Sequence, residues 1–579
     1  MLFLRFNILF FIILSGILFN TYAQELPVGM TEEEKAIMPY YLSNISSRGI
    51  TTPPNGKLRN MGEWEEIQAL LITWRSYYPE LAQIVNAAQQ ECEVLINCTD
   101  SNSVKTSLLA YNVTPNANVK YNIVNTNSVW IRDYGPNSVY INDVDTLILV
   151  DWIYNRPRPF DDIIPASVAN FYNIPHYETT TSPFALVHTG GNYFSDGFGT
   201  AFSENLILDE NQSLTAAQVD TIMKKFMGIE RYIKLTNLPN DGIHHIDMHM
   251  KLLNEETLLV GQFPTGVSDG PQIEANLQYI LSNYNSVFGT PYKIVRIPMP
   301  PSTSGNYPPN SHYLTFSNGI FVNKTYLLPT YYQQYDTTAI RIISDALPGY
   351  NVVPINSNNI IPASGAIHCI SHSVGVPDPL LISTQPYPDT NDLVSSYVIK
   401  AKILHQSGIQ NASIYYRINT LQTFSSISMI ITDTVNKILT GSIPQQQAGD
   451  TVKYYIKAIA NSNKQQVRPI TAPDGYWKFK IKGTAGIRDA TLYPLIKMLP
   501  VFPNPAAAIT CIPLKSNVRI EVEIGLYDML GHKVKEIHNG WISAGKSHYF
   551  IDASNIPAGI YFIQLNSNKH ATIQKFFVK

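Results

Sequence analysis

The spacing of apolar residues changes at one place in the chain, near residues 376–392. Before it, from residue 60 to about 375, strand-like runs such as TLILVDWIY alternate with stretches such as LTAAQVDTIMKKFM, which have helical spacing. After it, runs such as ASIYYRIN and TVKYYIKAIA alternate apolar and polar residues by two, with turn residues between them. The sequence therefore predicts one large α/β unit followed by structure built of strands alone.

The length of the chain requires more than one hydrophobic core. Its 579 residues exceed the roughly 250–300 residues beyond which chains split into domains. Residues 24–55 are polar and end in TTPPNG, which indicates a linker or pro-segment. We predict three domains: the α/β unit at 56–378, a β-sandwich of immunoglobulin-like size at 384–483, and a smaller β domain at 495–579.

Residues 1–23 have the pattern of a secretory signal peptide. One arginine precedes a short apolar run, and Thr21 and Ala23 are small residues placed where signal peptidase cleaves. A membrane anchor is the alternative, but the run is short and polar residues follow it at once. We predict cleavage after Ala23, export of the chain and no transmembrane segment.

Charge and cysteine content exclude two kinds of protein. The net charge is −3 and no long run of Lys or Arg occurs, so nucleic acid is not an expected partner. The four cysteines are too few for a disulfide framework. Cys92 and Cys98 lie in one strand-like run, where their Cα atoms would stand about 20 Å apart, against the roughly 5.5 Å of a disulfide. We expect these two to be buried thiols.

Cys369 lies between two histidines in SGAIHCISHSVG. A free thiol is only a few per cent thiolate at neutral pH, so a nucleophilic cysteine needs a histidine or a cationic substrate nearby. On a strand, His368 and His372 would lie on the opposite face or a few residues away. We therefore expect the partner from elsewhere, with His245 favoured. A buried, inert thiol is the alternative.

Two further stretches carry polar residues that could do chemistry. Asp133, in VWIRDYGP, follows a strand-like run and could line a cleft or pair with Arg132 on an exposed turn. In GIHHIDMHMKLL, read as a strand, His245, Asp247 and His249 share one face. They could be three metal ligands, an acid/base histidine beside a carboxylate, or structural residues.

A glycine-rich stretch, HTGGNYFSDGFGTAFSEN, predicts tight turns around a hairpin. No helix follows it in the manner of a dinucleotide or phosphate loop, so nucleotide binding is not expected. A cysteine, a histidine and two aspartates together favour covalent attack on a cationic carbon centre. Two carboxylates suit a guanidinium, which presents a planar fork of N–H donors.

The order of these motifs resembles the agmatine deiminase and bacterial peptidylarginine deiminase superfamily. W-x-R-D-x-G-P, G-G-N with D-G-x-G-T, H-x-D and I-H-C-I occur in that order between residues 60 and 375. The resemblance implies the pentein fold, a five-bladed, pseudo-symmetric α/β propeller with its site at the centre. It identifies the α/β unit as the deiminase catalytic domain.

By this resemblance, Cys369 matches the nucleophile and His245 the general acid/base. Asp133 and Asp247 match the carboxylates that hold the guanidinium, and Trp130 would line the substrate channel. The implied reaction passes through a thiouronium intermediate and releases ammonia and then citrulline, with no metal or other cofactor required.

Arg156 and Arg158 lie on one side of DWIYNRPRPFDD by period two. The stretch resembles the Porphyromonas-type peptidylarginine deiminase, in which paired arginines bind the C-terminal carboxylate of peptide substrates. The alternative is a solvated basic loop paired with Asp161 and Asp162. The predicted substrates are peptides or proteins with arginine, preferably C-terminal.

The end of the chain, with FPNPAAA, YDMLGHKV and KFFVK, resembles a type IX secretion sorting domain. It implies that the type IX machinery is a partner and that the protein is secreted or held at the bacterial outer-membrane surface. Three alternatives remain: a deiminase of agmatine-like small guanidino compounds, a surface binding protein on a degenerate deiminase domain, and a metal-dependent hydrolase using His245, Asp247 and His249.

Overall fold

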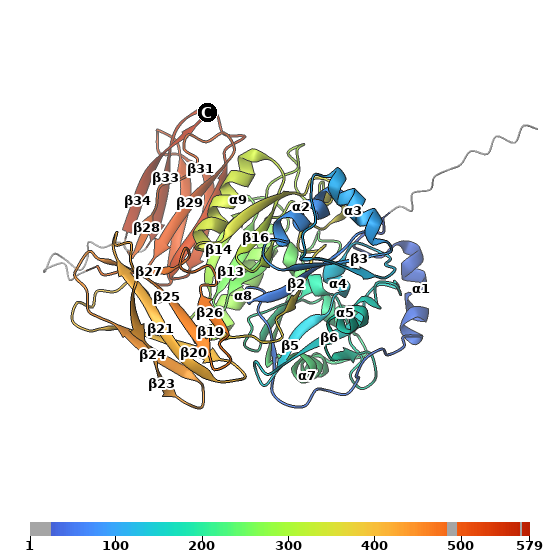
Figure 1. Cartoon of the computed structure of the whole chain (residues 1–579). Helices are drawn as coiled ribbons and strands as arrows, with labels where there is room; N and C mark the ends of the chain where they lie inside the picture. The colour runs from blue at the N-terminus through green and yellow to red at the C-terminus, as the bar shows by residue number, and fades with distance from the viewer. Residues whose placement is uncertain (1–24, 483–494, 568–569) are drawn as a thin grey trace, which may run out of the picture.

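The computed structural model describes residues 25–482, 495–567 and 570–579 (Figure 1). The predicted signal peptide, residues 1–23, lies outside the described residues. Among the helices in the described part of the chain, none combines the length and the apolar character that a membrane crossing needs.

Five small sheets within residues 58–375 repeat one pairing pattern. In each, a central strand pairs antiparallel with one neighbour and parallel with the other. The triplets, central strand second, are β18 (His372–Gly375), β2 (Ile67–Thr73) and β3 (Glu93–Cys98); β5 (Asn137–Ile141), β6 (Thr146–Tyr154) and β7 (His176–Thr179); β9 (Phe194–Ser195), β10 (Thr200–Glu204) and β11 (Arg231–Leu235); β12 (Met250–Asn254), β13 (Thr257–Gln262) and β14 (Lys293–Pro298); and β15 (Ile320–Val322), β16 (Thr325–Thr330) and β17 (Asn351–Asn356).

Helices join each central strand to its parallel neighbour, because a parallel pair cannot be closed by a tight turn. The joining helices are α2 (Tyr78–Ala88), α5 (Ile164–Tyr172), α6 (Leu206–Asp209) with α7 (Ala216–Met227), α8 (Gly270–Asn283) and α9 (Gln333–Ala346). Three edge strands, β1 (Leu58–Asn60), β4 (Val119–Ile123) and β8 (Val187–His188), extend two of the sheets, and α3 (Ser101–Ala110) precedes β4. Pairing of β18 with β2 joins the last triplet strand in the chain to the first.

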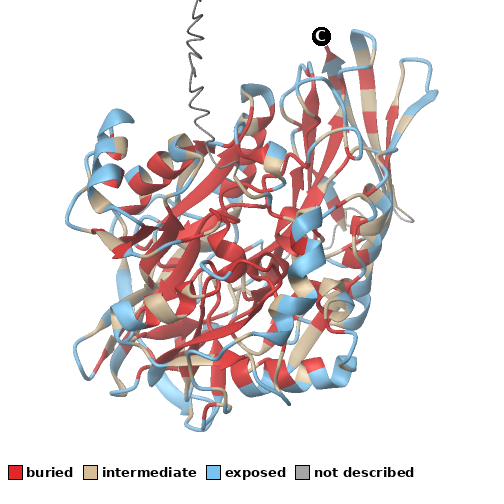
Figure 2. Ribbon diagram, turned by 90° about the vertical axis from the view of Figure 1, so that its right-hand side faces the viewer, coloured by how far each residue is buried: buried red, intermediate tan, exposed pale blue. Residues whose placement is uncertain are grey.

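The helix α7 shows how the sequence produces these elements. Thr215 caps its first turn together with Gln218, and Gly228 ends it in the left-handed conformation that suits glycine. Its buried residues, at helical spacing, are Val219, Ile222, Met223, Phe226 and Met227. The helix expected in LTAAQVDTIMKKFM from apolar spacing is therefore confirmed. Figure 2 shows the result: the central strands are buried and the outer faces of the helices are exposed.

Two antiparallel sheets follow the α/β unit. One contains β19 (Leu381–Ser383), β20 (Tyr397–Leu404), β24 (Ile438–Ile443) and β23 (Ile430–Asp433); the other contains β22 (Ser425–Ser428), β21 (Ile409–Ile418), β25 (Thr451–Ala460), β26 (Gln465–Arg468) and β27 (Trp477–Lys480). They enclose a separate core that includes Tyr397, Ile414 and Tyr454. The first sheet begins at Leu381, slightly before the expected start at residue 384.

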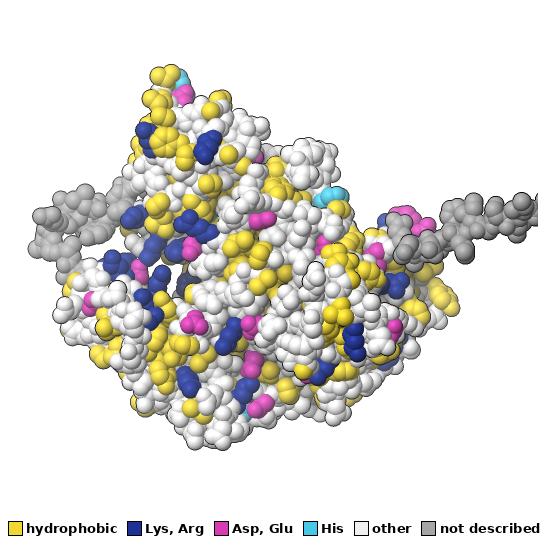
Figure 3. All heavy atoms as spheres, turned by 45° about the horizontal axis from the view of Figure 1, so that its top comes forward, with side chains coloured by type: hydrophobic (Ala, Val, Ile, Leu, Met, Phe, Trp, Pro, Cys, Tyr) yellow, Lys and Arg dark blue, Asp and Glu magenta, His cyan; other side chains and the backbone are white. Residues whose placement is uncertain are grey.

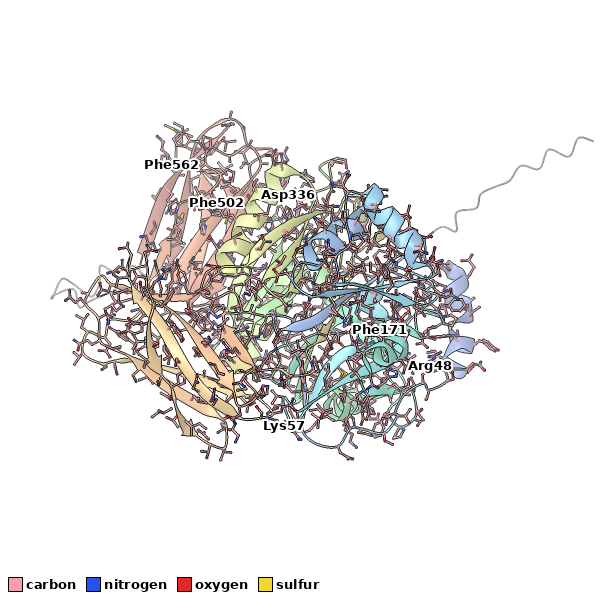
Figure 4. All side chains as sticks on the ribbon, viewed as in Figure 1. Arg48, Lys57, Phe171, Asp336, Phe502 and Phe562 are labelled. Carbon is pink, nitrogen blue, oxygen red and sulfur yellow. The ribbon has the colours of Figure 1, made fainter. Side chains whose placement is uncertain are left out.

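The last part of the chain forms two more antiparallel sheets. They contain β28 (Ile496–Met498), β29 (Ile509–Ser516) and β32 (Gly545–Asp552), and β31 (Lys533–Ile542), β30 (Ile520–Tyr527), β33 (Gly559–Ser567) and β34 (His570–Val578). Phe502 reaches toward α9, where its ring lies 3.7 Å from the guanidinium carbon of Arg341 (Figure 4). On the face shown in Figure 3, Lys and Arg side chains gather near the junction of these β units. Asp389 pairs with Lys482 and with Lys515 of β29.

Candidate active site

Each triplet is entered through a connection, and the five connections carry the candidate site. Asp133 lies in α4 (Ile131–Tyr134) before β5, and Gly191 in η1 (Gly190–Asn192) before β9. Asp247 lies in η2 (Ile246–Met248) before β12, Asn318 precedes β15, and Cys369 precedes β18. Side chains far apart in the sequence therefore meet because each repeat begins at the same place.

The Cys369 thiol is surrounded by polar groups and is fully buried. Asn318 Nδ2 donates a hydrogen bond to its Sγ at 3.3 Å, and Asp247 Oδ2 lies 3.8 Å from the same atom. Burial, followed by the negative charges of Asp247 and Asp133, raises the pKa of the Cys369 thiol well above its ordinary value. These surroundings favour the protonated form of the thiol.

His245 lies between the two aspartates and the backbone of the glycine-rich stretch. Its Nδ1 is 3.6 Å from Asp133 Oδ1, which also accepts a hydrogen bond from the Gly191 N–H at 3.2 Å. Among the described residues, neither ring nitrogen of His245 nor Oδ1 of Asp247 has a hydrogen-bond partner, although all three atoms are buried. Buried polar atoms are nearly always paired, so these atoms are suited to the N–H groups of a guanidinium.

A charged network fixes Asp247. His368 Nδ1 lies 2.6 Å from Asp247 Oδ2, and its Nε2 lies 2.6 Å from Glu63 Oε1. Glu63 also contacts Lys251, and its Oε1 lies 3.3 Å from Arg132 NH1. Burial alone would raise the pKa of Asp247, but the hydrogen bond and charge of His368 lower it below its usual value. Asp247 is therefore held as a carboxylate.

The structure brings together the four predicted catalytic residues, yet it corrects the local geometry behind three expectations. Residues 364–371 are turns and β18 begins only at His372, so His368 is not on the far face of a strand but binds Asp247. VWIRDYGP enters the short helix α4 rather than ending a strand.

The strand expected through His245, Asp247 and His249 begins only at Met250, after the η2 turn. His249 Nε2 lies 3.7 Å from Glu204 instead. These three residues therefore do not form the metal site considered from the sequence. In the described part of the chain, the residues placed closely enough to hold an ion are Asp151, His176 and Glu178, with ligand atoms within 4.8 Å of one another. The Arg48 backbone N–H already binds Glu178 there.

Sequence reasoning misses three residues that contact the site. Asn318 lies in the family-like stretch YLTFSNGIFVN, whose pattern assigns it no role. The sequence around Gly191 predicts only a tight turn. The sequence around Glu63 gives no sign that this residue contacts the site. The signal for Gly191 is the doubled glycine, because a Cβ there would lie 2.3 Å from His245 Nδ1 and 2.9 Å from Asp133 Oδ1.

Replacing Gly191 with alanine is expected to lower turnover by about 100-fold while the chain remains folded, because the added methyl displaces His245 from Asp133. The matched control is Gly242→Ala, in the same connection as His245, where a Cβ meets nothing within 4 Å. Initial rates and thermal unfolding check both variants. Equal rates in the two variants would contradict this geometry.

The three predicted substrate-binding residues are buried beneath the start of the described chain. Trp130 Nε1 donates to the Leu26 carbonyl at 2.8 Å, and Arg156 Nε donates to the Val28 carbonyl at 2.9 Å. Arg158 lies 2.7 Å from a Glu34 carboxylate oxygen. Their exposed fractions are 0%, 5% and 1%, so the arginines are not a solvated loop. Asp161 binds Ser128 and Asp162 binds Arg48, whereas the alternative expected them to pair with Arg156 and Arg158.

A thiol, an imidazole and two carboxylates meet at the connections between the α/β repeats, and the class of protein that this fold and the family match define is a deiminase of the pentein type. The chain belongs to the Porphyromonas-type peptidyl-arginine deiminase family, whose model matches residues 59–374. Residues 500–579 match the secretion system C-terminal sorting domain.

Known relatives agree with this class. A protein of Mycoplasma mycoides subsp. mycoides, provisionally named agmatine deiminase, is 24% identical over 365 residues, covering 56% of this chain and 98% of its own. One of Vibrio parahaemolyticus with the same name is 27% identical over 280 residues, covering 43% and 76%. A solved structure, also provisionally named agmatine deiminase, matches with a TM-score of 0.50 at 19% identity, over 57% of this chain and all of its own, and shares the fold.

Proposed function

We propose that the chain is an exported protein-arginine deiminase that converts arginine, preferably at the C-terminus of a peptide, to citrulline and ammonia. The observation that carries this proposal is the pair Arg156 and Arg158, two buried guanidinium groups that, like Trp130, bind backbone carbonyls of residues 26–29. Agmatine has no carboxylate, so a site for agmatine gains nothing from two arginines. A free peptide C-terminus supplies the anion that such a pair binds.

The reaction begins when the substrate guanidinium binds between Asp133 and Asp247. Its positive charge offsets the two negative charges that raise the pKa of Cys369, which favours loss of the thiol proton to His245 and formation of the thiolate. The thiolate then attacks the guanidinium carbon, and His245 protonates the departing ammonia, leaving a thiouronium. His245 next takes a proton from water, which attacks the same carbon and releases citrulline and the thiolate.

The domain expectations are also part of this proposal. The five triplets would be the blades of a pseudo-symmetric propeller around the site within residues 56–378, and the sheets of 384–483 an immunoglobulin-like domain. Residues 24–55 would be a pro-segment behind a cleaved signal peptide, and 495–579 the sorting domain. A signal peptide and a sorting domain together support delivery of the protein by type IX machinery to the medium or the outer-membrane surface.

The alternative is a deiminase of agmatine or a similar small guanidino compound, which the names of the relatives favour. The test compares ammonia release from a peptide ending in arginine, the same peptide with an amidated C-terminus, and agmatine. Because residues 25–34 lie on the arginines, each assay is run with the intact chain and after a specific cut within residues 44–48. The proposal fails if agmatine is turned over as fast as the free-carboxylate peptide or faster.

Replacing Arg156 or Arg158 with alanine is expected to raise KM for the free-carboxylate peptide by about 10- to 100-fold with little change in kcat, because a charge-assisted hydrogen bond is lost. The amidated peptide is the matched control, and its KM should change little. Steady-state kinetics of the cut chain check this. A loss of the same size on both peptides would show that the arginines do not bind the carboxylate.

A further inference from the structure

Residues 25–34, called here the N-terminal segment, lie across the groups proposed to bind substrate. Their backbone carbonyls accept hydrogen bonds from Trp130, Arg156 and Arg158. Arg158 NH2 donates to the Pro27 carbonyl at 2.7 Å and to the Gly29 carbonyl at 3.0 Å. The segment also presents an anion: the Glu34 carboxylate accepts from Nε and NH2 of Arg158 at 2.7 and 3.1 Å. A peptide backbone and a carboxylate are therefore already bound to the two arginines.

The four candidate catalytic residues are closed off from solvent. Cys369 and His245 are 0% exposed, Asp133 1% and Asp247 2%. A guanidinium that enters from solvent cannot reach the thiol unless a covering element moves. Since the N-terminal segment holds Trp130 and both arginines, it is the element that a peptide substrate has to displace.

We infer that the N-terminal segment is an internal inhibitor, so that the chain folds as a latent enzyme and becomes active when this segment is released. The inference rests on the proposed function, since it takes Trp130, Arg156 and Arg158 as the substrate site. The segment binds as a substrate peptide would, with carbonyls along the arginines and Glu34 in place of a C-terminal carboxylate. It places no arginine there, so it is not itself turned over.

The attachment of the segment explains how release would occur. Glu34 is fixed by the capping box of α1 (Glu32–Ser43), in which its side chain also accepts from the Thr31 N–H at 2.9 Å. Most of α1 beyond Glu34 is exposed. Residues 46–48 are exposed too, whereas Ile50 is anchored through its N–H to the His176 carbonyl at 2.9 Å. A cut at this loop frees the segment and leaves the domain intact.

The loop is also accessible to another protein. Arg48 lies with α1 at the outer edge of the α/β unit, away from both C-terminal β units (Figures 1 and 4). A segment tethered beside its site has an effective concentration in the millimolar range, so modest affinity is enough to hold it. Once cut, the same segment binds as a free peptide and is lost on dilution. Cleavage thus becomes an activating step.

The first experiment uses the full chain with a specific-protease recognition sequence inserted between Asn44 and Ile45, which keeps Arg48 and its bonds to Glu178 and Asp162. Citrulline and ammonia release from a C-terminal-arginine peptide are measured before and after cutting. We expect a rise of at least about tenfold after cutting and dilution, reversed by millimolar synthetic peptide of residues 25–43. Equal activity before and after the cut, when both are high, overturns the inference and leaves the proposed function standing.

Binding separates the two possible failures. A fluorescent peptide of residues 25–43 is titrated into the cut, dialysed chain, and anisotropy reports its affinity without any turnover. Saturable binding that Arg158→Ala weakens at least about tenfold supports the inference. If such binding is seen but no arginine substrate is turned over, only the proposed function is rejected. Absence of binding overturns the inference.

A point variant tests the same contact in the uncut chain. Glu34→Ala removes the anion from Arg158 and is expected to raise the activity of the intact chain at least about fivefold. The matched control is Glu33→Ala, an exposed glutamate in the same turn of α1. Equal activity of the two intact variants would overturn the inference.

Discussion

Cys369→Ala is expected to lower citrulline formation by at least about 10,000-fold, measured on the chain after the loop cut. The thiol lies where the connections meet, with Asn318 donating to its sulfur and Asp247 beside it. Alanine fits the same buried space, so the fold should persist. Substrate binding, measured by the protection of Trp130 fluorescence from a quencher, should survive the substitution.

The control for this variant is Cys92→Ala. Cys92 is another buried free thiol, but it lies before β3 and has no contact with the site residues. It should keep nearly full activity. If Cys369→Ala retained activity, the covalent mechanism would be wrong. If the natural chain made no citrulline or ammonia from any guanidino substrate, cut or uncut, the binding-protein alternative would gain support.

The four catalytic candidates can be predicted because each lies in a short motif whose residues are adjacent in sequence. What these motifs do not provide is the local geometry. Period two places His245 and Asp247 on a strand, whereas the chain forms the η2 turn there. The close approach at Gly191 is also missed: its missing side chain lets the backbone of η1 approach Asp133 and His245.

Other features depend on tertiary contacts that no spacing reveals. Asn318 reaches the sulfur only because β15 begins a repeat, and the five repeats share a pairing pattern without an obvious sequence repeat. Residues 24–55 have the composition of a polar linker, yet Glu34 pairs with Arg158 across 124 positions. Apolar periodicity locates α7 well, because its buried face is set by local spacing.

Asp247→Asn is expected to change two properties in opposite directions. Turnover should fall by about 1,000-fold, because the substrate guanidinium loses one of two buried carboxylates. The asparagine oxygen can still accept from His368, so the network at Glu63 should stay in place. Reactivity of the Cys369 thiol toward a small neutral alkylating reagent should instead rise.

The sign of the second effect follows from the charges around the sulfur. Asp247 lies 3.8 Å from Sγ, and its negative charge raises the pKa of the Cys369 thiol. Removing that charge lowers this pKa, so at any pH below it the thiolate fraction grows, by about tenfold when the pKa falls by one.

Alkylation of the Cys369 thiol in the cut chain is followed by mass spectrometry across pH 6–10. The midpoint of its pH dependence should therefore move to lower pH in Asp247→Asn. Asp196→Asn, which removes a buried carboxylate elsewhere in the α/β unit, should leave the midpoint unchanged. A midpoint that moved upward, or stayed fixed, in Asp247→Asn would mean that the carboxylate does not hold the thiol protonated, and that the substrate's charge is not what ionises it.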